Sequence, residues 1–352
     1  MKKWMIALLV LLLALPAEIS LAIGSKTASV QLATGKKYVS YVSFSASEPV
    51  ELRPVLAQNK VGKTQELAQM AKTHKALAAI NGTYFNPYDE KDLQPMGGIV
   101  INGAVQHFRG GAVAMGITAQ NELIFSEGNP YSLVGTLNAG TPQEKSWSAF
   151  NVNHLPTSQA EAVLFTPAFR TATLSIAGFR FVAVSEGKVS AITKDNAVIP
   201  ANGFVVAYGS QRRDSDNFHI GDTAVYRLQP SPGFEKAVHM ISVGPRLVAA
   251  GKSAVDLSSF TEAKITTQKG QRSFIGMKAD KTIVMGTVSN VTILELAEIA
   301  VKLGLADAMA LDGGASSGLY YDGSYVTKAG RNLSNALVVV KKQQATVLAP
   351  KK

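Results

Sequence analysis

Cysteine is absent from the 352 residues of this chain. Without a thiol, the chain forms no disulfide, no cysteine metal site and no thiolate nucleophile, and it carries no lipid attached at cysteine. Its stability therefore has to come from a hydrophobic core. A chain of this length buries roughly three quarters of the surface that its unfolded form exposes, so a core alone can hold it together.

Metal-ligand and nucleic-acid patterns are also missing. The histidines form no H-E-x-x-H pair and are dispersed over the chain at His74, His107, His154, His219 and His239. We therefore expect no zinc site and no cofactor; a calcium site made of Asp oxygens stays open, although the chain has no EF-hand-type loop. No basic run is interleaved with aromatic residues, so nucleic acid is not an expected partner. The formal charge of +10 instead favours anionic partners such as phosphate-rich cell-wall polymers, acidic polysaccharide or a membrane surface.

Long apolar runs are confined to the N-terminus. Lys2 and Lys3 precede an apolar run over 4–15, and Ser20-Leu21-Ala22 offers a small-x-small cleavage site, an order typical of a secretory signal peptide. The run is shorter than the roughly 20 residues that a membrane-spanning helix needs. We expect cleavage after residue 22 and a mature chain that is secreted, either extracellular or periplasmic, with no membrane span.

Hydrophobic periodicity predicts mostly strands. Apolar and polar residues alternate over 23–51, and short strand-like runs fill 133–200. Helices are predicted over 64–75 and over 292–303, where Thr292-x-x-Glu295 forms a capping box. Turn dipeptides predict hairpins at Asn102-Gly103, Asn202-Gly203 and Asp322-Gly323.

Two stretches, 66–117 and 295–340, share one order of elements: helix, strand, Asn-Gly or Asp-Gly loop, hairpin, arginine and strand. We therefore predict an α+β fold, a mixed β-sheet domain with few helices and two quasi-repeated helix–strand–hairpin halves. Asn81 and Asp312 would then lie at equivalent strand ends and line one cleft. The expected divisions are a signal peptide at 1–22, N-terminal strands at 23–50, the domain at 51–342 and a frayed tail at 343–352.

A glycine loop carries the candidate carboxylate, Asp312. The loop follows the apolar run 308–311 and reads Asp312-Gly313-Gly314-Ala315-Ser316-Ser317. Its backbone N–H groups are free to bind an anion; in the alternative interpretation, Asp312 only closes an Asx-turn. Residues 314–318 match the G-x-S-x-G pattern of serine hydrolases, but a predicted hairpin follows them instead of a helix, and the last histidine lies upstream. Ser316 and Ser317 are therefore kept as hydrogen-bond donors.

Three further charged residues have competing interpretations. Glu295 could act as a general acid or base, but its place in the capping box already gives it a structural role, which we favour. Arg272 and Arg246 each follow a glycine-containing dipeptide, and either could form a bidentate clamp on phosphate. The alternative for both is an ordinary surface arginine.

Five motifs occur in a fixed order along the chain. They are Asn81-Gly-x-Tyr84-Phe85-Asn86, Gly97-Gly98-x-Val100-x-x-Gly103, Gly244-Pro245-x-Leu247-Val248, Arg272-x-x-x-Gly276 and Leu311-Asp312-Gly313-Gly314-x-Ser316-Ser317. With this set, the chain resembles the phosphodiester glycosidase family, which includes secreted bacterial members of exopolysaccharide type. The resemblance covers residues 40 to 340. One departure is that the family often has Asp-Gly after the strand found here at 283–287.

The resemblance implies an α+β domain that hydrolyses a sugar-1-phosphodiester at the anomeric carbon, in a surface glycan or teichoic-type polymer. It implies catalytic roles for Asp312, Arg272 and Asn81. The substrate-binding candidates, taken from the same motifs and from the arginine clamp, are Gly82, Asn86, Arg246, Gly313, Gly314, Ser316 and Ser317. Two alternatives stay open: a phosphodiesterase that cleaves P–O, and a non-catalytic glycan-binding or exopolysaccharide-export protein.

Overall fold

The computed structural model describes residues 21–109 and 113–342, so most of the expected signal peptide and the expected tail lie outside the described residues. Five β-sheets make up this part of the chain. The largest has seven strands in the order β1 (Ile23–Leu32), β2 (Gly35–Ser45), β21 (Thr282–Val291), β20 (Gly270–Lys278), β22 (Leu305–Ala310), β18 (Arg246–Ala249) and β19 (Lys252–Ser253). We call it the large sheet.

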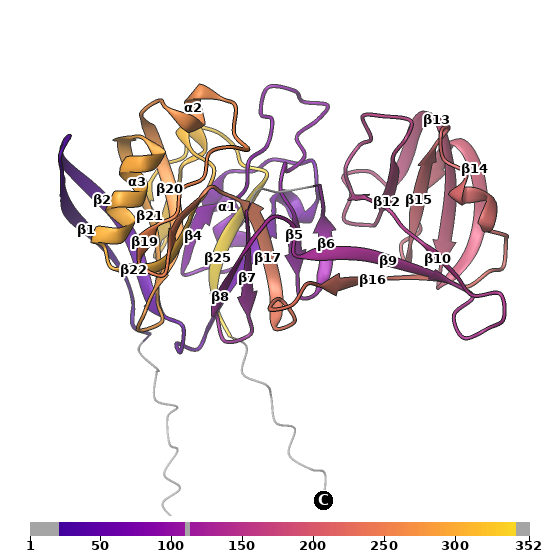
Figure 1. The fold of residues 1–352 in the computed structure, drawn as a ribbon, viewed down its shortest axis with the longest axis horizontal. Coiled ribbons are helices and arrows are strands. Elements are labelled where there is room, and N and C mark those ends of the chain that lie inside the picture. The colour runs from indigo at the N-terminus through magenta and orange to yellow at the C-terminus, as the bar shows by residue number, and fades with distance from the viewer. Residues whose placement is uncertain (1–20, 110–112, 343–352) are drawn as a thin grey trace, which may run out of the picture.

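Two five-stranded sheets pack beside the large sheet. One has the order β24 (Ser324–Thr327), β23 (Leu319–Tyr321), β4 (Ala78–Asn81), β25 (Asn335–Lys341) and β3 (Val50–Leu56). The other has the order β6 (Ala104–His107), β5 (Ile99–Ile101), β17 (Ala237–Val243), β7 (Val113–Thr118) and β8 (Leu123–Glu127). These three sheets form the body of the protein on the left of Figure 1.

A separate lobe holds the middle of the chain. Its sheet has the order β11 (Asn151–Val152), β12 (Ala162–Phe165), β15 (Gly203–Gly209), β13 (Thr173–Ser185) and β14 (Lys188–Val198). A three-stranded sheet of β10 (Lys145–Trp147), β9 (Tyr131–Leu137) and β16 (Ala224–Pro230) connects it with the body. Figure 1 shows β9 and β16 running side by side between the two parts.

The helices cover sheets on the body. They are α1 (Leu67–Thr73), α2 (Ala263–Thr266) and α3 (Ile293–Lys302), with 3-10 turns at Ala57–Asn59, Asp214–Asn217 and Gly314–Ser316. Helix α3 packs Leu296, Ile299 and Ala300 against the large sheet, and its capping box between Thr292 and Glu295 is formed as predicted. Helix α1 buries the apolar face expected over 64–75.

The fold is mainly β, so the predicted α+β class with two quasi-repeated halves is wrong. Of the described residues, 51% lie in strands and only 10% in helices. The few helices cover faces of sheets and do not alternate regularly with strands. Pairing also crosses between the predicted halves, because β4 lies between β23 and β25 rather than beside β5. The order of elements along a chain does not specify which strand a given strand pairs with. For that reason, the shared order of elements wrongly predicted two repeated halves.

Two of the three predicted hairpins are confirmed. Asn102-Gly103 joins β5 to β6, and Asp322-Gly323 joins β23 to β24, with positive φ at all four residues. The hairpin predicted at Asn202-Gly203 is wrong. This turn leads from β14 to β15, and β13 lies between those two strands in the sheet.

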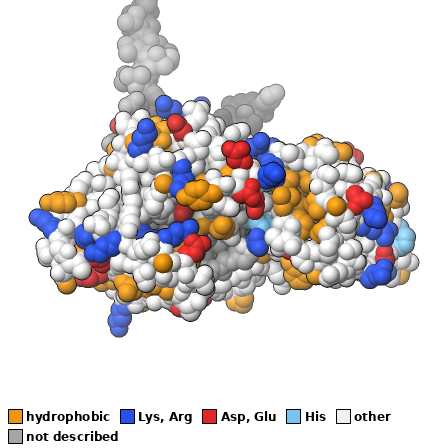
Figure 2. All heavy atoms as spheres, turned by 90° about the horizontal axis from the view of Figure 1, so that it is seen from above, with side chains coloured by type: hydrophobic (Ala, Val, Ile, Leu, Met, Phe, Trp, Pro, Cys, Tyr) orange, Lys and Arg blue, Asp and Glu red, His pale blue; other side chains and the backbone are white. Residues whose placement is uncertain are grey.

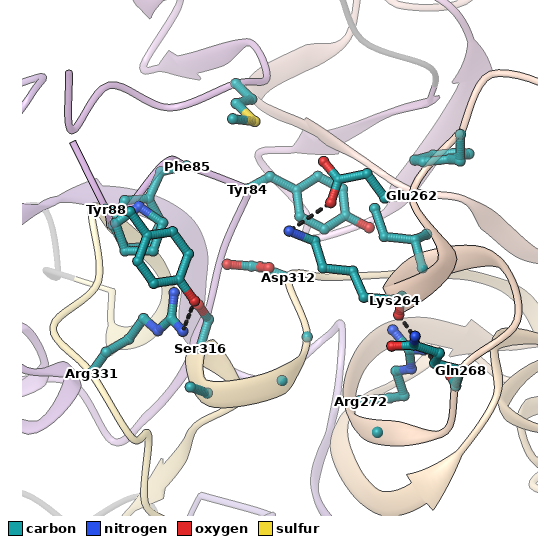
Figure 3. A pocket seen from close by; sticks show the side chains of 18 of the residues that line it. Tyr84, Phe85, Tyr88, Glu262, Lys264, Gln268, Arg272, Asp312, Ser316 and Arg331 are labelled. Atoms are coloured by element: carbon teal, nitrogen blue, oxygen red, sulfur yellow. Dashed lines mark hydrogen bonds and ion pairs between the residues drawn. The ribbon is translucent and has the colours of Figure 1, made fainter.

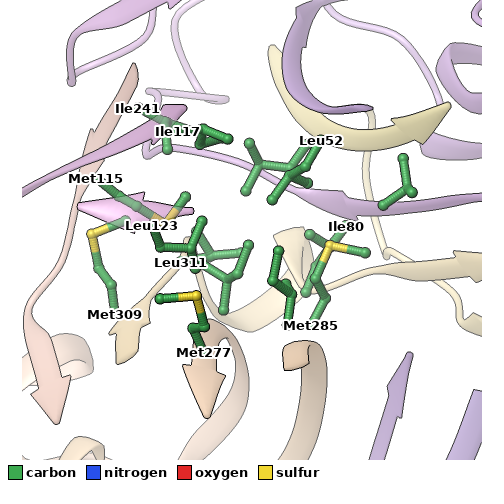
Figure 4. Packing of buried hydrophobic residues seen from close by; sticks show 14 of the residues in the cluster. Leu52, Ile80, Met115, Ile117, Leu123, Ile241, Met277, Met285, Met309 and Leu311 are labelled. Atoms are coloured by element: carbon green, nitrogen blue, oxygen red, sulfur yellow. The ribbon is translucent and has the colours of Figure 1, made fainter. Parts of the chain in front are cut away.

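A central core fills the space between the three sheets of the body. Leu52, Ile80, Met115, Met285 and Leu311 meet there from separate strands and loops, each at most 2% exposed, and Figure 4 shows them converging. Because Leu311 is fixed in this core, the residue that follows it starts from a rigid point. None of the described helices is long and apolar enough to cross a membrane.

Candidate functional site

The backbone of Asp312 is tied to strand β4 on both sides. Its N–H donates to the Gly82 carbonyl at 3.0 Å, and its own carbonyl accepts from Asn81 Nδ2 at 2.6 Å. Asn81 Oδ1 accepts from the Gly318 N–H at 3.0 Å. The Leu311 N–H, one residue earlier, donates to the Ser273 carbonyl on β20 at 2.9 Å. The carboxylate loop is therefore held by strands from two different sheets.

Asn81 and Gly82 are brought next to Asp312, but neither lines the cavity into which Asp312 faces. Asn81 is 1% exposed, and both polar atoms of its side chain are used to hold the loop. A Cβ at Gly82 would lie 1.9 Å from Asn335 Oδ1, so any larger residue would force the Asn335 side chain to move. Both residues therefore lie behind Asp312 and hold the backbone of its loop in position.

A cavity of about 500 Å³ opens in front of Asp312. Its lining comes from three segments, 84–88, 259–272 and 312–316, together with Met96 and Arg331. In Figure 3, Asp312 lies between Tyr84 and Lys264 on one side and Tyr88 and Arg331 on the other. On the face seen in Figure 2, basic side chains are scattered among acidic ones.

Burial in this cavity raises the pKa of Asp312 from 3.8 to about 7. The Ser316 hydroxyl, the Gly313 N–H and the charges of Arg331 and Lys264 favour the ionised carboxylate, but together they only partly oppose the loss of solvation. A carboxyl group whose pKa is moved to neutrality in a cleft is a recognised mark of a reactive site.

Arg272 lies on β20 and is 6% exposed. Its Nη2 donates to the carbonyls of Lys264 at 2.8 Å and Gln268 at 2.7 Å, and its Nε donates to Val291 at 3.3 Å. A Cβ at Gly313 would lie 3.4 Å from Arg272 Nη1, so this end of the guanidinium faces the carboxylate loop. Arg272 thus joins the segment of α2 to the loop of Asp312.

Residues 170–340 match the family model described as phosphodiester glycosidase. The resemblance is confirmed over this range, which is shorter than the 40–340 expected from the motifs. The matched range contains Arg272 and Asp312 but not Asn81. No curated protein matches this chain.

Solved structures with a similar fold are known. A hypothetical protein from Synechocystis superposes with a TM-score of 0.78 at 21% identity, over 90% of this chain and 62% of that one, so this chain spans less than two thirds of that protein. A Burkholderia pseudomallei K96243 protein described as "Putative exported protein" gives 0.69 at 19% identity, over 87% and 74%. The zebrafish N-acetylglucosamine-1-phosphodiester alpha-N-acetylglucosaminidase catalytic domain, auto-inhibited by its pro-peptide, gives 0.49 at 13% identity, over 92% and 85%. At these identities, the likeness to the Synechocystis and Burkholderia proteins shows the fold alone.

The remaining candidates of this phosphodiester glycosidase-like chain divide into two groups. Gly313, Gly314 and Ser316 line the cavity beside Asp312, as the motif suggested. Ser317, Asn86 and Arg246 do not line it. Ser317 is buried, and Asn86 Oδ1 accepts from the Tyr88 N–H at 3.1 Å.

Arg246 is directed elsewhere by its partners. It forms an ion pair with Asp307, lies 3.7 Å from a Glu127 oxygen and stacks over the Phe125 ring at 5.0 Å. The strand predicted at 283–287 continues as β21 to Val291, and the next residue after 287, Val288, is buried. The family's Asp-Gly turn therefore has no counterpart at that point.

Sequence reasoning missed the lining residues Glu262, Lys264, Tyr88 and Arg331. Glu262 and Lys264 lie in a connection between β19 and β20 that has no helical or strand periodicity, so no pattern marked them. Arg331 was noticed only as an arginine shared by the two predicted halves. Within the described chain, no group of three or more histidine, aspartate or glutamate side chains is placed to hold a metal.

Proposed function

We propose that this protein is an exported hydrolase that cleaves a sugar-1-phosphodiester between the anomeric carbon and the phosphate oxygen. The observation that carries the proposal is the Asp312 carboxylate, held rigidly in a cavity that is lined by cationic side chains. The family match over 170–340 supports the reaction class. Export is supported by the predicted signal peptide and by the description of the Burkholderia protein.

The chemistry needs few groups. The leaving group is a phosphate monoester, a weak base, so a strong general acid matters less than in glycosidases that act on ordinary glycosides with two carboxylates. As the C–O bond breaks, its electron pair stays with the phosphate oxygen and positive charge develops on the sugar ring. The ionised Asp312 carboxylate stabilises that charge. Water then forms the new bond at the anomeric carbon and loses its proton to a base or to solvent.

Glu262 is a second carboxylate in the cavity lining. Its side chain is 56% exposed and forms an ion pair with Lys264 at 2.6 Å. This differs from the enclosed position of Asp312, and we assign the charge-stabilising role to Asp312.

Hydrolysis in heavy-oxygen water tests the position of cleavage. With a sugar-1-phosphodiester as substrate, C–O cleavage places the label in the released sugar, and mass spectrometry of both products reads it out. Label in the phosphate would instead support a phosphodiesterase. If a panel of sugar-1-phosphodiesters gave no turnover while glycans bound measurably, the protein would be a non-catalytic glycan-binding or export protein.

A further inference from the structure

Four cationic side chains line the cavity, but two of them are already engaged. Arg272 donates to three backbone carbonyls with its Nε and Nη2 groups. Lys269 lies 3.3 Å from Glu295, a carboxylate that also caps helix α3. These two side chains hold the walls of the cavity in place, so the other two cations are better placed to bind a phosphate.

Lys264 and Arg331 are those other two, and they approach from opposite walls (Figure 3). Lys264 belongs to α2, and its side chain is 68% exposed. Arg331 follows the β23–β24 hairpin and stacks over the Tyr88 ring at 5.3 Å, with Nη2 3.3 Å from the Tyr88 hydroxyl. The stacking holds the guanidinium plane and leaves donors of its fork free to reach an anion.

Glu262 holds Lys264 in the free protein. Their ion pair measures 2.6 Å, and both side chains are more than half exposed. Exposed pairs of this kind are weak, because water screens the charges and two long side chains lose freedom. A phosphate in the cavity would compete with the Glu262 carboxylate for the same ammonium group.

We propose that the phosphate group of the substrate binds between Lys264 and Arg331, and that it displaces Glu262 from Lys264 as it enters. The phosphate is that of the sugar-1-phosphodiester, so the inference rests on the function proposed above. Arg272 then positions the α2 segment that carries Lys264, through its bonds to the Lys264 and Gln268 carbonyls, rather than contacting the phosphate. Glu262 acts as a built-in competitor that makes entry selective for strong anions.

Calorimetric titration of the full chain with inorganic phosphate tests this arrangement without requiring turnover. We expect Lys264→Met and Arg331→Gln each to raise Kd by about three- to tenfold, because each removes a charged hydrogen bond at a partly exposed site. We expect Glu262→Gln to lower Kd by about threefold or more, since the competitor loses its charge. Added salt should weaken binding to wild type more than binding to Lys264→Met.

Helix α3 supplies the matched control. Glu298 and Lys302 form a similar exposed pair at 3.6 Å, with side chains 48% and 46% exposed, and neither lines the cavity. Glu298→Gln and Lys302→Met should leave Kd unchanged. A Glu262→Gln variant with unchanged or raised Kd would overturn the competition, and unchanged Kd in both Lys264→Met and Arg331→Gln would overturn the site.

The two proposals fail in different ways. If no sugar-1-phosphodiester is hydrolysed but phosphate binding follows Lys264, Arg331 and Glu262, the proposed reaction is wrong and the anion site stands. If turnover is found but phosphate binding ignores all three residues, the anion site is wrong and the reaction stands.

Discussion

Glu295 and Asp312 are both carboxylic acids with little exposure, yet their pKa values are shifted in opposite directions. At Glu295, burial alone would raise the pKa, but donors from Thr34, the Thr292 N–H and Lys269 outweigh it and hold the pKa at about 2. At Asp312, burial outweighs the donors and raises the pKa to about 7. The difference between the two sites lies in which effect dominates: hydrogen bonds and the Lys269 charge prevail at Glu295, whereas the loss of solvation prevails at Asp312.

That contrast separates a structural acid from a reactive one. Glu295 is stabilised in its ionised form, and all three donors fix its position at the start of α3. Asp312 is rigid in its backbone, while its ionised carboxylate is poorly stabilised by the free protein. A charge that is poorly stabilised at rest gains more when a complementary positive charge develops nearby, and that is the situation of a transition state.

The largest expected effect is on turnover. Asp312→Asn keeps the shape of the side chain but removes its charge, so we expect kcat/KM for a sugar-1-phosphodiester to fall by about 10³-fold. Glu295→Gln should lower it far less. Steady-state kinetics of both variants measures the contrast. A Glu295→Gln variant that folds with unchanged stability but has no turnover would show that our assignment of the two acids is reversed.

The next effect is on stability at high pH. Because the folded-state pKa of Asp312 is raised, its protonated form stabilises the fold below pH 3.8, and this contribution is lost as pH rises through about 7. Asp312→Asn cannot ionise, so above pH 8 it should be more stable than wild type by up to about 4 kcal/mol. Urea unfolding at pH 5 and pH 8.5 measures the difference. Equal stabilities at both pH values would mean that Asp312 ionises normally.

Glu295 should show the opposite dependence. Its folded-state pKa is depressed, so its contribution is present above pH 4.5 and is lost as pH falls toward 2. Glu295→Gln should therefore be less stable than wild type by about 2–3 kcal/mol at pH 7, with a smaller deficit at pH 3. Thermal unfolding across this range tests the sign. Glu298→Gln, on the exposed face of the same helix, serves as the control and should cost almost nothing.

The parts of the fold that could be predicted from the sequence are those set by local patterns. Helices α1 and α3, the capping box and the hairpins at Asn102-Gly103 and Asp322-Gly323 follow from local patterns, and they are present. The pairing of β4 with β23 and β25 joins residues more than two hundred positions apart. Periodicity places residues on the faces of a strand but does not identify the partner strand. Local sequence patterns therefore could not show that the predicted α+β repeat was wrong.

The cavity residues also differ in whether a local sequence signal could predict them. The Asp312 loop was marked by its Gly-Gly turn and by its motif, but Lys264 reaches it only because β20 lies beside β22 in the large sheet. Arg246 had a similar local signal to Arg272, yet it lies against Asp307 and Glu127. The partners of a charged side chain depend on long-range packing, and a turn dipeptide beside it carries no information about them.

The smallest expected effect comes from one donor of Glu295. Thr34, in the turn between β1 and β2, donates its hydroxyl to Glu295 Oε1, and its side chain is exposed. Thr34→Val removes that donor while Lys269 and the Thr292 N–H remain, so we expect a loss of only about 0.5–1 kcal/mol at pH 7. The pKa of Glu295 should rise but stay below its ordinary value, which NMR titration of the carboxyl carbon can follow. Thr27→Val, on the exposed part of β1, is the matched control, because Thr27 makes no side-chain hydrogen bond within the described residues. If Thr34→Val alone returned the pKa of Glu295 to 4.5, the hydroxyl and not the set of three donors would account for the difference between the two acids.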